Sequence, residues 1–377
     1  MASDKVLTAI GLMAGTSLDG VDAAVLRTDG RGVIEAGAFL TKPYSRQAKI
    51  EIRRATKAAL EGREGAADIA RAADEVTSAH IEAVRDLLDQ AGLKRGDVDV
   101  VGFHGQTILH RPPLDATAPG RSWQIGSGRT LAGELRIDVV EQVRQADMAA
   151  GGEGAPLAPI YHAALAGALG REEPVAILNL GGVANITYVP PGADAGGLVA
   201  FDCGPGNGLL DEWTMAKTGE PMDEGGRLAD AGEVDEPAVR MMCLDPFLRR
   251  KPPKSLDRYD FKLKSVEHLS AEDGAATLTA FTAACVARSV PLLPEPPAAF
   301  VVCGGGRHNP VLMAELDARL NADVMTAEEA GWRGDAVEAE CFAYLAVRSL
   351  KKLPISFPGT TRAPHPLTGG QYQRAPV

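Results

Sequence analysis

Apolar residues along the chain form two kinds of pattern, short β-rich runs and longer stretches with helical spacing. Three β-rich runs come first, followed by two helical stretches and a short buried strand. In chain order, these expected elements are strands at 6–10, 21–28 and 33–40, helices at 47–60 and 66–90, and a strand at 97–103. The opening strands are separated by short polar turns, which predicts a meander.

A second unit with the same design begins near residue 176. An apolar strand, a turn with Gly181 and Gly182, a return strand and a third strand repeat the opening arrangement. The later expected elements are strands at 176–180, 186–189, 198–201 and 299–303, and helices at 209–217, 271–293, 310–320 and 336–350. The repeated pattern predicts two α/β domains of similar topology with a cleft between them.

The turn between the first two strands, within residues 11–22, is rich in glycines, small hydroxyls and carboxylates. Glycine has no Cβ, so such a turn can bring backbone N–H groups close to a bulky anion. Asp19 and Asp22 could hold a hydrated divalent cation beside that anion. A polar β-hairpin loop is the alternative interpretation. The turn lacks the Lys-Ser/Thr pair of a P-loop and the GxGxxG spacing of a dinucleotide site.

Composition narrows the possible partners. The chain has 377 residues, which suggests roughly two domains by length. Its formal net charge is −11, with no long basic run, which argues against nucleic acid and anionic membranes as partners. We expect no secretory signal and no apolar segment of membrane-spanning length. The five cysteines are scattered without a CxxC pair, which predicts a reduced, cytoplasmic protein without a zinc site or disulfides.

Several polar motifs stand where strands are expected to end. Asp202 follows an apolar strand, and the Gly-Pro-Gly after Cys203 leaves space around its carboxylate. Such a carboxylate can take a proton from water, or it can simply cap the following helix. The basic stretch 249–255 is interpreted as a solvated loop, with contact to an anion as the alternative.

Eight motifs in one order along the chain carry a resemblance to a known family. They are Met13–Asp22, His104–Thr107, Trp123–Gly126, Gly151–Leu157, Asn179–Asn185, Asp202–Asn207, Cys303–Gly306 with Asn309-Pro310, and Gly334-Asp335 with Glu338-Ala339. The chain thereby resembles the acetate and sugar kinase/Hsp70/actin superfamily, and more closely the anhydro-N-acetylmuramic acid kinase family. The resemblance implies two actin-like (ribonuclease H-like) domains, with mixed sheets flanked by helices and with ATP and sugar in the cleft between them. We expect a first domain at 1–138, on which the tail 355–377 packs, and a second at 139–354.

The resemblance also implies an activity. The family uses ATP to phosphorylate 1,6-anhydro-N-acetylmuramic acid and opens its anhydro bridge with water, in the recycling of cell-wall amino sugars. It further implies a homodimer. Two alternatives remain open from the sequence. One is a levoglucosan-type kinase, whose sugar lacks the lactyl acid, and the other is an ATP-driven chaperone or filament protein of the same superfamily.

Roles for individual residues follow from the same resemblance. Asp202 is the expected general base, and Asp19 the expected Mg²⁺ residue, acting through water. Expected ATP contacts are Gly15, Thr16, Ser17, Leu18, Asp19, Gly20, Val21 and Asp22, with Gly181 and Gly182 as a second phosphate turn and Gly304, Gly305 and Gly306 at the adenosine. Expected sugar contacts are Arg144, for the lactyl carboxylate, with His104, Asp147 and Glu338. Departures from the family's pattern include Ala14, Ser127, Gln142, Glu153 and Cys203.

Overall fold

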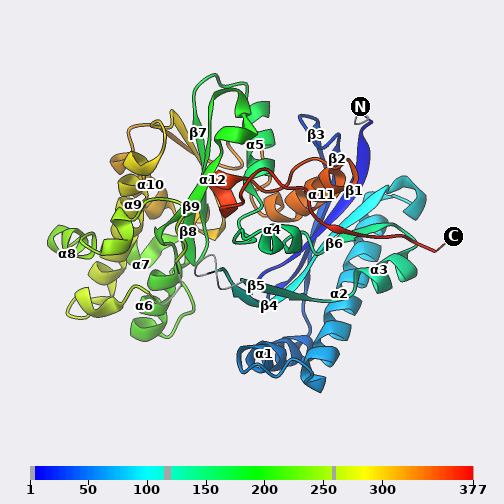
Figure 1. The fold of residues 1–377 in the computed structure, drawn as a ribbon. Coiled ribbons are helices and arrows are strands. Elements are labelled where there is room, and N and C mark those ends of the chain that lie inside the picture. Colours follow the sequence, from blue (N-terminus) through cyan, green and yellow to red (C-terminus); the bar gives the residue numbers. More distant parts are fainter. Residues whose placement is uncertain (1–4, 114–119, 257–259, 377) are drawn as a thin grey trace. The chain divides into compact units, whose positions relative to one another are not determined.

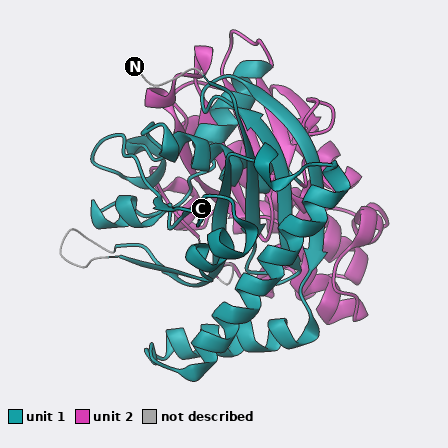
Figure 2. Ribbon diagram, turned by 90° about the vertical axis from the view of Figure 1, so that its right-hand side faces the viewer, with its two compact units in different colours: residues 1–168, 336–377 teal, residues 169–335 magenta. Residues whose placement is uncertain are grey.

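The computed structural model describes residues 5–113, 120–256 and 260–376. It divides the chain into two compact units (Figure 2), with residues 1–168 and 336–377 in unit 1 and residues 169–335 in unit 2. Each unit contains one mixed sheet with helices around it (Figure 1), which confirms the expected α/β architecture.

The sheet of unit 1 is built on the predicted meander. Its central strands follow the order β6-β4-β1-β2-β3, with β4 parallel to β1 and β6, and with β12 and β5 added antiparallel. The strands are β1 (Leu7–Ala14), β2 (Gly20–Thr28), β3 (Ile34–Pro43), β4 (Val100–Arg111), β5 (Arg121–Ile125), β6 (Val139–Glu141) and β12 (Gln371–Gln373). The helices are α1 (Arg46–Leu60), α2 (Ala67–Ala91), α3 (Gly128–Leu135), α4 (Gln145–Ala149), α5 (Pro159–Ala168), α11 (Val337–Leu350) and α12 (Pro358–Thr361).

Helices cover both faces of this sheet. Ile10 and Leu12 on β1 pack into one core with residues of α1 and α2. Gly11 lies between them and therefore faces the other side, where a Cβ would come within 1.8 Å of the Ala339 carbonyl oxygen in α11. Gly102 on β4 is equally close to the backbone of α11. The two glycines thus allow α11 to lie directly on the sheet.

The units differ in extent from the domains expected at 1–138 and 139–354. Residues 139–168 belong to unit 1, because β6 pairs with β4 in its sheet. Residues 336–354 also belong to unit 1, because α11 packs on the same sheet. The tail is in unit 1 as well, where β12 pairs with β6. The chain therefore passes between the units twice, after residues 168 and 335.

Unit 2 repeats the central strand order of unit 1. Its sheet has the order β11-β10-β7-β8-β9, in which three antiparallel strands are followed by two parallel ones. The strands are β7 (Val175–Leu180), β8 (Val183–Val189), β9 (Val199–Pro205), β10 (Ala299–Cys303) and β11 (Asp323–Thr326). The helices are α6 (Gly208–Thr218), α7 (Arg227–Asp230), α8 (Glu236–Met242), α9 (Ala271–Ser289) and α10 (Pro310–Arg319). The predicted internal repeat is confirmed.

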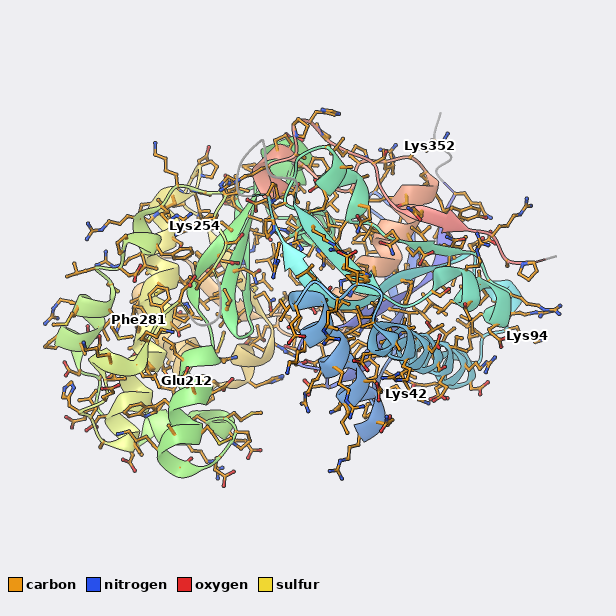
Figure 3. The ribbon with its side chains drawn as sticks, turned by 60° about the horizontal axis from the view of Figure 1, so that its bottom comes forward. Lys42, Lys94, Glu212, Lys254, Phe281 and Lys352 are labelled. Carbon is orange, nitrogen blue, oxygen red and sulfur yellow. The ribbon has the colours of Figure 1, made fainter. Side chains whose placement is uncertain are left out.

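The longest helix of unit 2 corrects one expectation. The segment Ala271–Leu292, formed by α9 and the turn after it, is long and apolar enough to cross a membrane, and 72% of its most apolar window is buried in the protein. The expectation that no segment reaches this length was therefore wrong. Phe281 on α9, labelled in Figure 3, is fully buried in an apolar cluster with Trp213 and Phe261. This burial is that of a core helix.

A buried histidine makes the stability of unit 1 depend on pH. His80 on α2 is fully buried, its Nδ1 lies 2.7 Å from the Val76 carbonyl oxygen, and burial lowers its pKa to about 4. An unfolded histidine titrates near a pKa of about 6.5, so between these values only the unfolded chain takes up the proton. Acidification through this range therefore destabilises the folded protein.

We expect the variant His80→Leu to reduce this pH dependence. Each such histidine contributes a slope of about 1.4 kcal/mol per pH unit between roughly pH 4 and pH 6.5. Urea unfolding at several pH values measures the slope, and the exposed His365→Leu serves as the control. A slope unchanged by His80→Leu would contradict the prediction.

Candidate active site

The first glycine turn, residues 15–19, presents polar side chains to solvent. Thr16, Ser17 and Asp19 are exposed, whereas Leu18 is buried with a positive φ of 62°. A leucine in this left-handed conformation is strained, and its burial holds the turn in place. The Gly15 carbonyl oxygen accepts a 3.0 Å hydrogen bond from Nε2 of the fully buried Gln106 on β4.

The end of this turn has a structural role. Gly20 lies so close to β3 that a Cβ would come within 2.3 Å of the Lys42 carbonyl oxygen. Val21 is fully buried, and Asp22 accepts a 2.6 Å hydrogen bond from the Thr41 hydroxyl. Leu18, Gly20 and Val21 therefore have no exposed side chain for a nucleotide. Of the expected contacts in residues 15–22, Thr16, Ser17 and Asp19 have exposed side chains, and Asp22 is half-buried.

Arg144 and His104 lie together in unit 1. A guanidinium nitrogen of Arg144 lies 3.2 Å from Nε2 of His104, and another donates a 2.8 Å hydrogen bond to the Gly154 carbonyl oxygen. Because arginine only donates, Nε2 of His104 must be unprotonated. Burial, followed by the Arg144 charge, lowers the pKa of His104 well below its usual value, which keeps the ring neutral. His104 is 5% exposed, so the structure shows it orienting Arg144.

Arg144 has the features of an anion-binding residue. Its side chain is half-buried, and burial lowers its pKa. Among the described residues, no carboxylate lies within ion-pair distance of its guanidinium group. A desolvated guanidinium without an anionic partner is costly, and a ligand carboxylate would satisfy it in a bidentate manner. The structure therefore presents Arg144 as the unit 1 residue best suited to an acidic ligand.

Asp147 is engaged by the protein itself. It is 2% exposed, and its two oxygens accept hydrogen bonds of 2.6 Å each, from the Gly154 N–H and from the Thr361 hydroxyl on α12. Gly152 is packed so tightly that a Cβ would lie 2.3 Å from the same carboxylate. Asp147 thus fixes the glycine-rich loop 151–156 that also accepts a bond from Arg144. A direct contact between Asp147 and sugar stays a prediction.

Glu338 stands in the first turn of α11, where the close packing of this helix on the sheet places it. Its side chain is exposed at the surface of the protein. Partial desolvation, followed by the charge of Asp22, raises its pKa, while the positive charge of Arg144 acts in the opposite direction. The structure thus brings Glu338 into the electrostatic environment of Arg144 and Asp22.

In unit 2, Asp202 lies within β9 and does not end it, because the strand continues to Pro205. The side chain is half-buried, and its Oδ2 accepts a 2.8 Å hydrogen bond from the Leu256 N–H. The ladder between β8 and β9 shifts register beside Asn185, the residue opposite Asp202. Such bulges are frequent next to active sites, where they redirect a side chain.

The segment that holds Asp202 was missed by sequence reasoning. Lys254, expected in a solvated loop, is 2% exposed, whereas Arg249, Arg250 and Lys251 are exposed. Its Nζ donates a 3.1 Å hydrogen bond to the Phe247 carbonyl oxygen and lies 4.4 Å from the centroid of the Phe247 ring. Burial lowers the pKa of Lys254. Its own carbonyl oxygen accepts the Asp202 N–H at 3.0 Å, so this buried lysine anchors the strand beside the carboxylate.

The second glycine turn and the triple glycine lie together in unit 2. The carbonyl oxygens of Gly181 and Gly182 accept hydrogen bonds from the backbone at the start of α6, of 2.7 Å from Asn207 and of 3.1 Å from Gly208. A Cβ on Gly304 would lie 2.4 Å from the Asn179 side chain, and one on Gly306 would lie 2.6 Å from Leu180. The strand end at β7 and the turn after β10 therefore form one glycine-lined surface.

Arg307 fixes this surface and was not anticipated from the sequence. Its side chain is 2% exposed and donates to the Gly304 carbonyl oxygen at 2.9 Å. It also forms ion pairs with Glu328 at 3.0 Å and with Asp335 at 2.8 Å. Asn309 accepts hydrogen bonds from the Val311 and Leu312 N–H groups and is therefore the N-cap of α10. The only sequence signal for Arg307 was its place directly after the three glycines.

The described residues contain no cluster of three or more His, Cys, Asp or Glu side chains suited to a metal ion. Mg²⁺ is commonly bound by one or two carboxylates together with substrate phosphates and water. The exposed Asp19, beside the exposed hydroxyls of Thr16 and Ser17, fits that mode of binding.

Comparison with known proteins finds relatives over nearly the whole chain. A family model described as anhydro-N-acetylmuramic acid kinase matches residues 7–374. The anhydro-N-acetylmuramic acid kinase of Rhizorhabdus wittichii is 51% identical over 370 residues, covering 98% of this chain and 99% of the relative. That of Zymomonas mobilis is 49% identical over 373 residues, covering 97% and 99%. Among solved structures, the activator of 2-hydroxyisocaproyl-CoA dehydratase from Clostridium difficile, solved with bound ADPNP, is similar with a TM-score of 0.45. The two proteins are 12% identical, and the match covers 92% of this chain and 96% of the other. This similarity is too distant to support functional comparison.

The chain has two α/β units with the same central strand order, and each unit has a glycine turn. Its relatives match over nearly the full chain. Together these features define an ATP-dependent sugar kinase. The chain belongs to the anhydro-N-acetylmuramic acid kinase family. The family expected from the motifs is thereby confirmed.

Proposed function

We propose that this kinase opens the 1,6-anhydro bridge of 1,6-anhydro-N-acetylmuramic acid with water and phosphorylates O6, giving N-acetylmuramic acid 6-phosphate and ADP. The half-buried Asp202, oriented by the Leu256 N–H beside a β-bulge, is the observation that carries the proposal. Peptidoglycan amino-sugar recycling is the metabolic setting that this reaction implies.

Asp202 acts as the general base. The anhydro sugar has no free 6-hydroxyl, because O6 is bonded to C1. Asp202 takes a proton from water, the water oxygen forms a bond to C1, and the C1–O6 bond breaks. O6 then accepts the γ-phosphoryl group of ATP, and Asp202 later releases its proton to solvent. A base of this kind contributes about 10²- to 10⁴-fold to the rate.

Unit 1 residues bind the acidic sugar. Arg144 pairs with the lactyl carboxylate, and the neutral His104 holds the guanidinium in place. Glu338, exposed in the first turn of α11, can accept hydrogen bonds from sugar hydroxyls. Asp147 contributes by fixing the loop whose Gly154 carbonyl oxygen accepts from Arg144.

The glycine turns bind ATP. Thr16 and Ser17 contact its phosphates through their hydroxyls and backbone, Gly181 and Gly182 form the second phosphate turn, and Gly304, Gly305 and Gly306 lie against the adenosine. Asp19 holds Mg²⁺ through water, and the ion neutralises charge on the phosphates when bound. Gly304 and Gly306 pack against Asn179 and Leu180, directly before the second turn, which supports assigning both segments to one nucleotide site.

We also propose that the enzyme works in the cytoplasm as a homodimer, with a small sugar as its ligand and without nucleic acid or membrane partners. The net charge of −11 supports the last two points. All five cysteines are free and buried, as expected in a reducing compartment. The dimer rests on family resemblance, and light scattering measures it directly.

Turnover in ¹⁸O-water tests the reaction. With ATP, Mg²⁺ and the anhydro sugar, we expect one ¹⁸O atom at the C1 hydroxyl of a 6-phosphorylated product, because the water oxygen bonds to C1. Mass spectrometry of the product locates the label. Exchange of the C1 hydroxyl with solvent is controlled by incubating unlabelled product in ¹⁸O-water for the same time. Unlabelled product, or ADP formation without a phosphosugar, would refute the mechanism.

A further inference from the structure

The C-terminal segment 357–362 packs on the glycine-rich loop 151–156 of unit 1. It contains α12, drawn in red in Figure 1, whose last residue contacts both α4 and the loop. Phe357, Thr360 and Thr361 are buried, so the segment is an integral part of unit 1. The chain therefore returns, near its C-terminus, to the surroundings of the candidate sugar residues.

Thr361 holds the loop at two points. Its carbonyl oxygen accepts a 2.7 Å hydrogen bond from the Glu153 N–H. Its hydroxyl donates a 2.6 Å hydrogen bond to Asp147, whose other oxygen accepts the Gly154 N–H at 2.6 Å. Thr361 thus fixes Glu153 directly and Gly154 through the Asp147 carboxylate.

Arg362 supplies a positive charge to the same loop. Its Nε lies 3.0 Å from Oε1 of Glu153. The Glu153 side chain is 9% exposed, whereas that of Arg362 is 48% exposed. A buried carboxylate needs a counter-charge, and removing that counter-charge is far more costly than losing a surface ion pair. The pair therefore keeps the Glu153 carboxylate inside the protein.

The loop and the C-terminal residues together surround Arg144. The carbonyl oxygen of Gly154, the residue after Glu153, accepts the 2.8 Å hydrogen bond from the Arg144 guanidinium. On the backbone of Arg144 itself, Gly369 packs so closely that a Cβ would come within 3.0 Å of the Val143 carbonyl oxygen. The direction of the guanidinium thus depends on contacts made by residues near the C-terminus.

We propose that Thr361 and Arg362 are positioning residues for Arg144. Through the loop they determine how strongly the enzyme prefers a sugar with a carboxylate over a neutral one. The inference rests on the proposed function, in which Arg144 pairs with the lactyl carboxylate. Without Arg362, the Glu153 carboxylate is buried without this counter-charge, so the loop moves to bring it to water. The Gly154 carbonyl oxygen then no longer orients the guanidinium.

The test combines charge removal with a change in the ligand. Arg362→Met keeps a long side chain without its charge, and Glu153→Gln, added in a double variant, removes the charge that Arg362 balances. Arg136→Met is the matched control, because Arg136 is also exposed and also ends a helix of unit 1 with a positive φ, of 52° against 59° for Arg362. Calorimetry gives Kd for the acidic anhydro sugar and for its lactyl amide, which is neutral.

We expect Arg362→Met to weaken binding of the acidic sugar about five- to tenfold and binding of the amide less than about twofold, as coupled residues of one network do. The double variant should recover most of the lost affinity, because glutamine needs no counter-charge. Glu153→Gln alone should keep the preference for the acid, since its amide oxygen still accepts from Arg362. Arg136→Met should bind both ligands as wild type does.

Three results with the variants would overturn the positioning role. They are equal losses for acid and amide in Arg362→Met, no loss in that variant, and a double variant that binds the acid as weakly as the single one. Failure of the proposed function appears in the wild-type enzyme instead. Absence of turnover of the acidic sugar, or equal affinity for acid and amide, would refute the proposed function before any variant is compared.

Discussion

Replacing Asp202 with asparagine is expected to lower kcat by about 10³-fold or more while ADP affinity changes less than twofold. A general base contributes about 10²- to 10⁴-fold, and an amide cannot take the proton from water. Asparagine keeps an oxygen that can accept the 2.8 Å hydrogen bond from the Leu256 N–H, so the local fold should persist. Steady-state kinetics and ADP calorimetry on the same preparation measure both quantities.

The control for this substitution is Asp194→Asn, which changes an exposed aspartate of the same unit that accepts a 3.1 Å bond from the Gly196 N–H. It should retain wild-type kcat. A residual ATPase in the Asp202 variant without sugar phosphorylation would indicate that phosphoryl transfer to water survives. Retained sugar turnover above a tenth of wild type would remove Asp202 from the role of base.

The two three-stranded meanders and the internal repeat were predictable from the sequence because both depend on local patterns. Strands β1, β2 and β3 are separated by short polar turns, and the same arrangement recurs from β7 to β9. The N-cap of α10 was also predictable, since Asn309 followed by Pro310 is a local signal that needs no tertiary contact. The need for glycine at positions 11 and 102 could not be predicted, because α11, the helix that packs against Gly11 and Gly102, lies more than 200 residues away in sequence.

Elements that depend on distant partners were harder to predict. β5 was expected only as part of the motif Trp123–Gly126, yet it pairs with the end of β4, which extends to Arg111. β11 is a four-residue edge strand that exists because it pairs with β10, and its own sequence has little β pattern. The two compact units differ in extent from the expected domains for the same reason, since α11 joins unit 1 through packing on a sheet distant in sequence.

The candidate site was likewise predictable where it depends on local sequence and not where it depends on distant partners. Thr16, Ser17 and Asp19 are exposed on the turn where the motif placed them. The sequence could not show that His104 is enclosed and bonded to Arg144, because residues 40 positions apart meet only through the sheet. Lys254 looked solvated because its neighbours are basic, whereas its ammonium group is in fact buried against Phe247.

Substituting Arg144 with alanine is expected to reduce kcat/KM for the acidic anhydro sugar by roughly 30- to 5,000-fold, equivalent to about 2–5 kcal/mol for losing one partner of a buried charge pair. The guanidinium is half-buried and lacks an ion-pair partner among the described residues, so a ligand carboxylate would be its principal counter-charge. Arg144→Lys should recover only part of the loss, because lysine keeps the charge without the planar fork.

The neutral 1,6-anhydro sugar levoglucosan, which lacks the lactyl acid, separates this role from structural damage. Arg144 also donates to the Gly154 carbonyl oxygen, so the alanine variant loosens the 151–156 loop for every substrate. If Arg144 pairs with the lactyl carboxylate, the loss for the acidic sugar must exceed the loss for levoglucosan by at least tenfold. Equal losses would assign Arg144 to loop structure, and a wild-type preference for levoglucosan would favour a kinase for neutral anhydro sugars. The ratio of the two losses therefore decides which sugar this arginine was placed to bind.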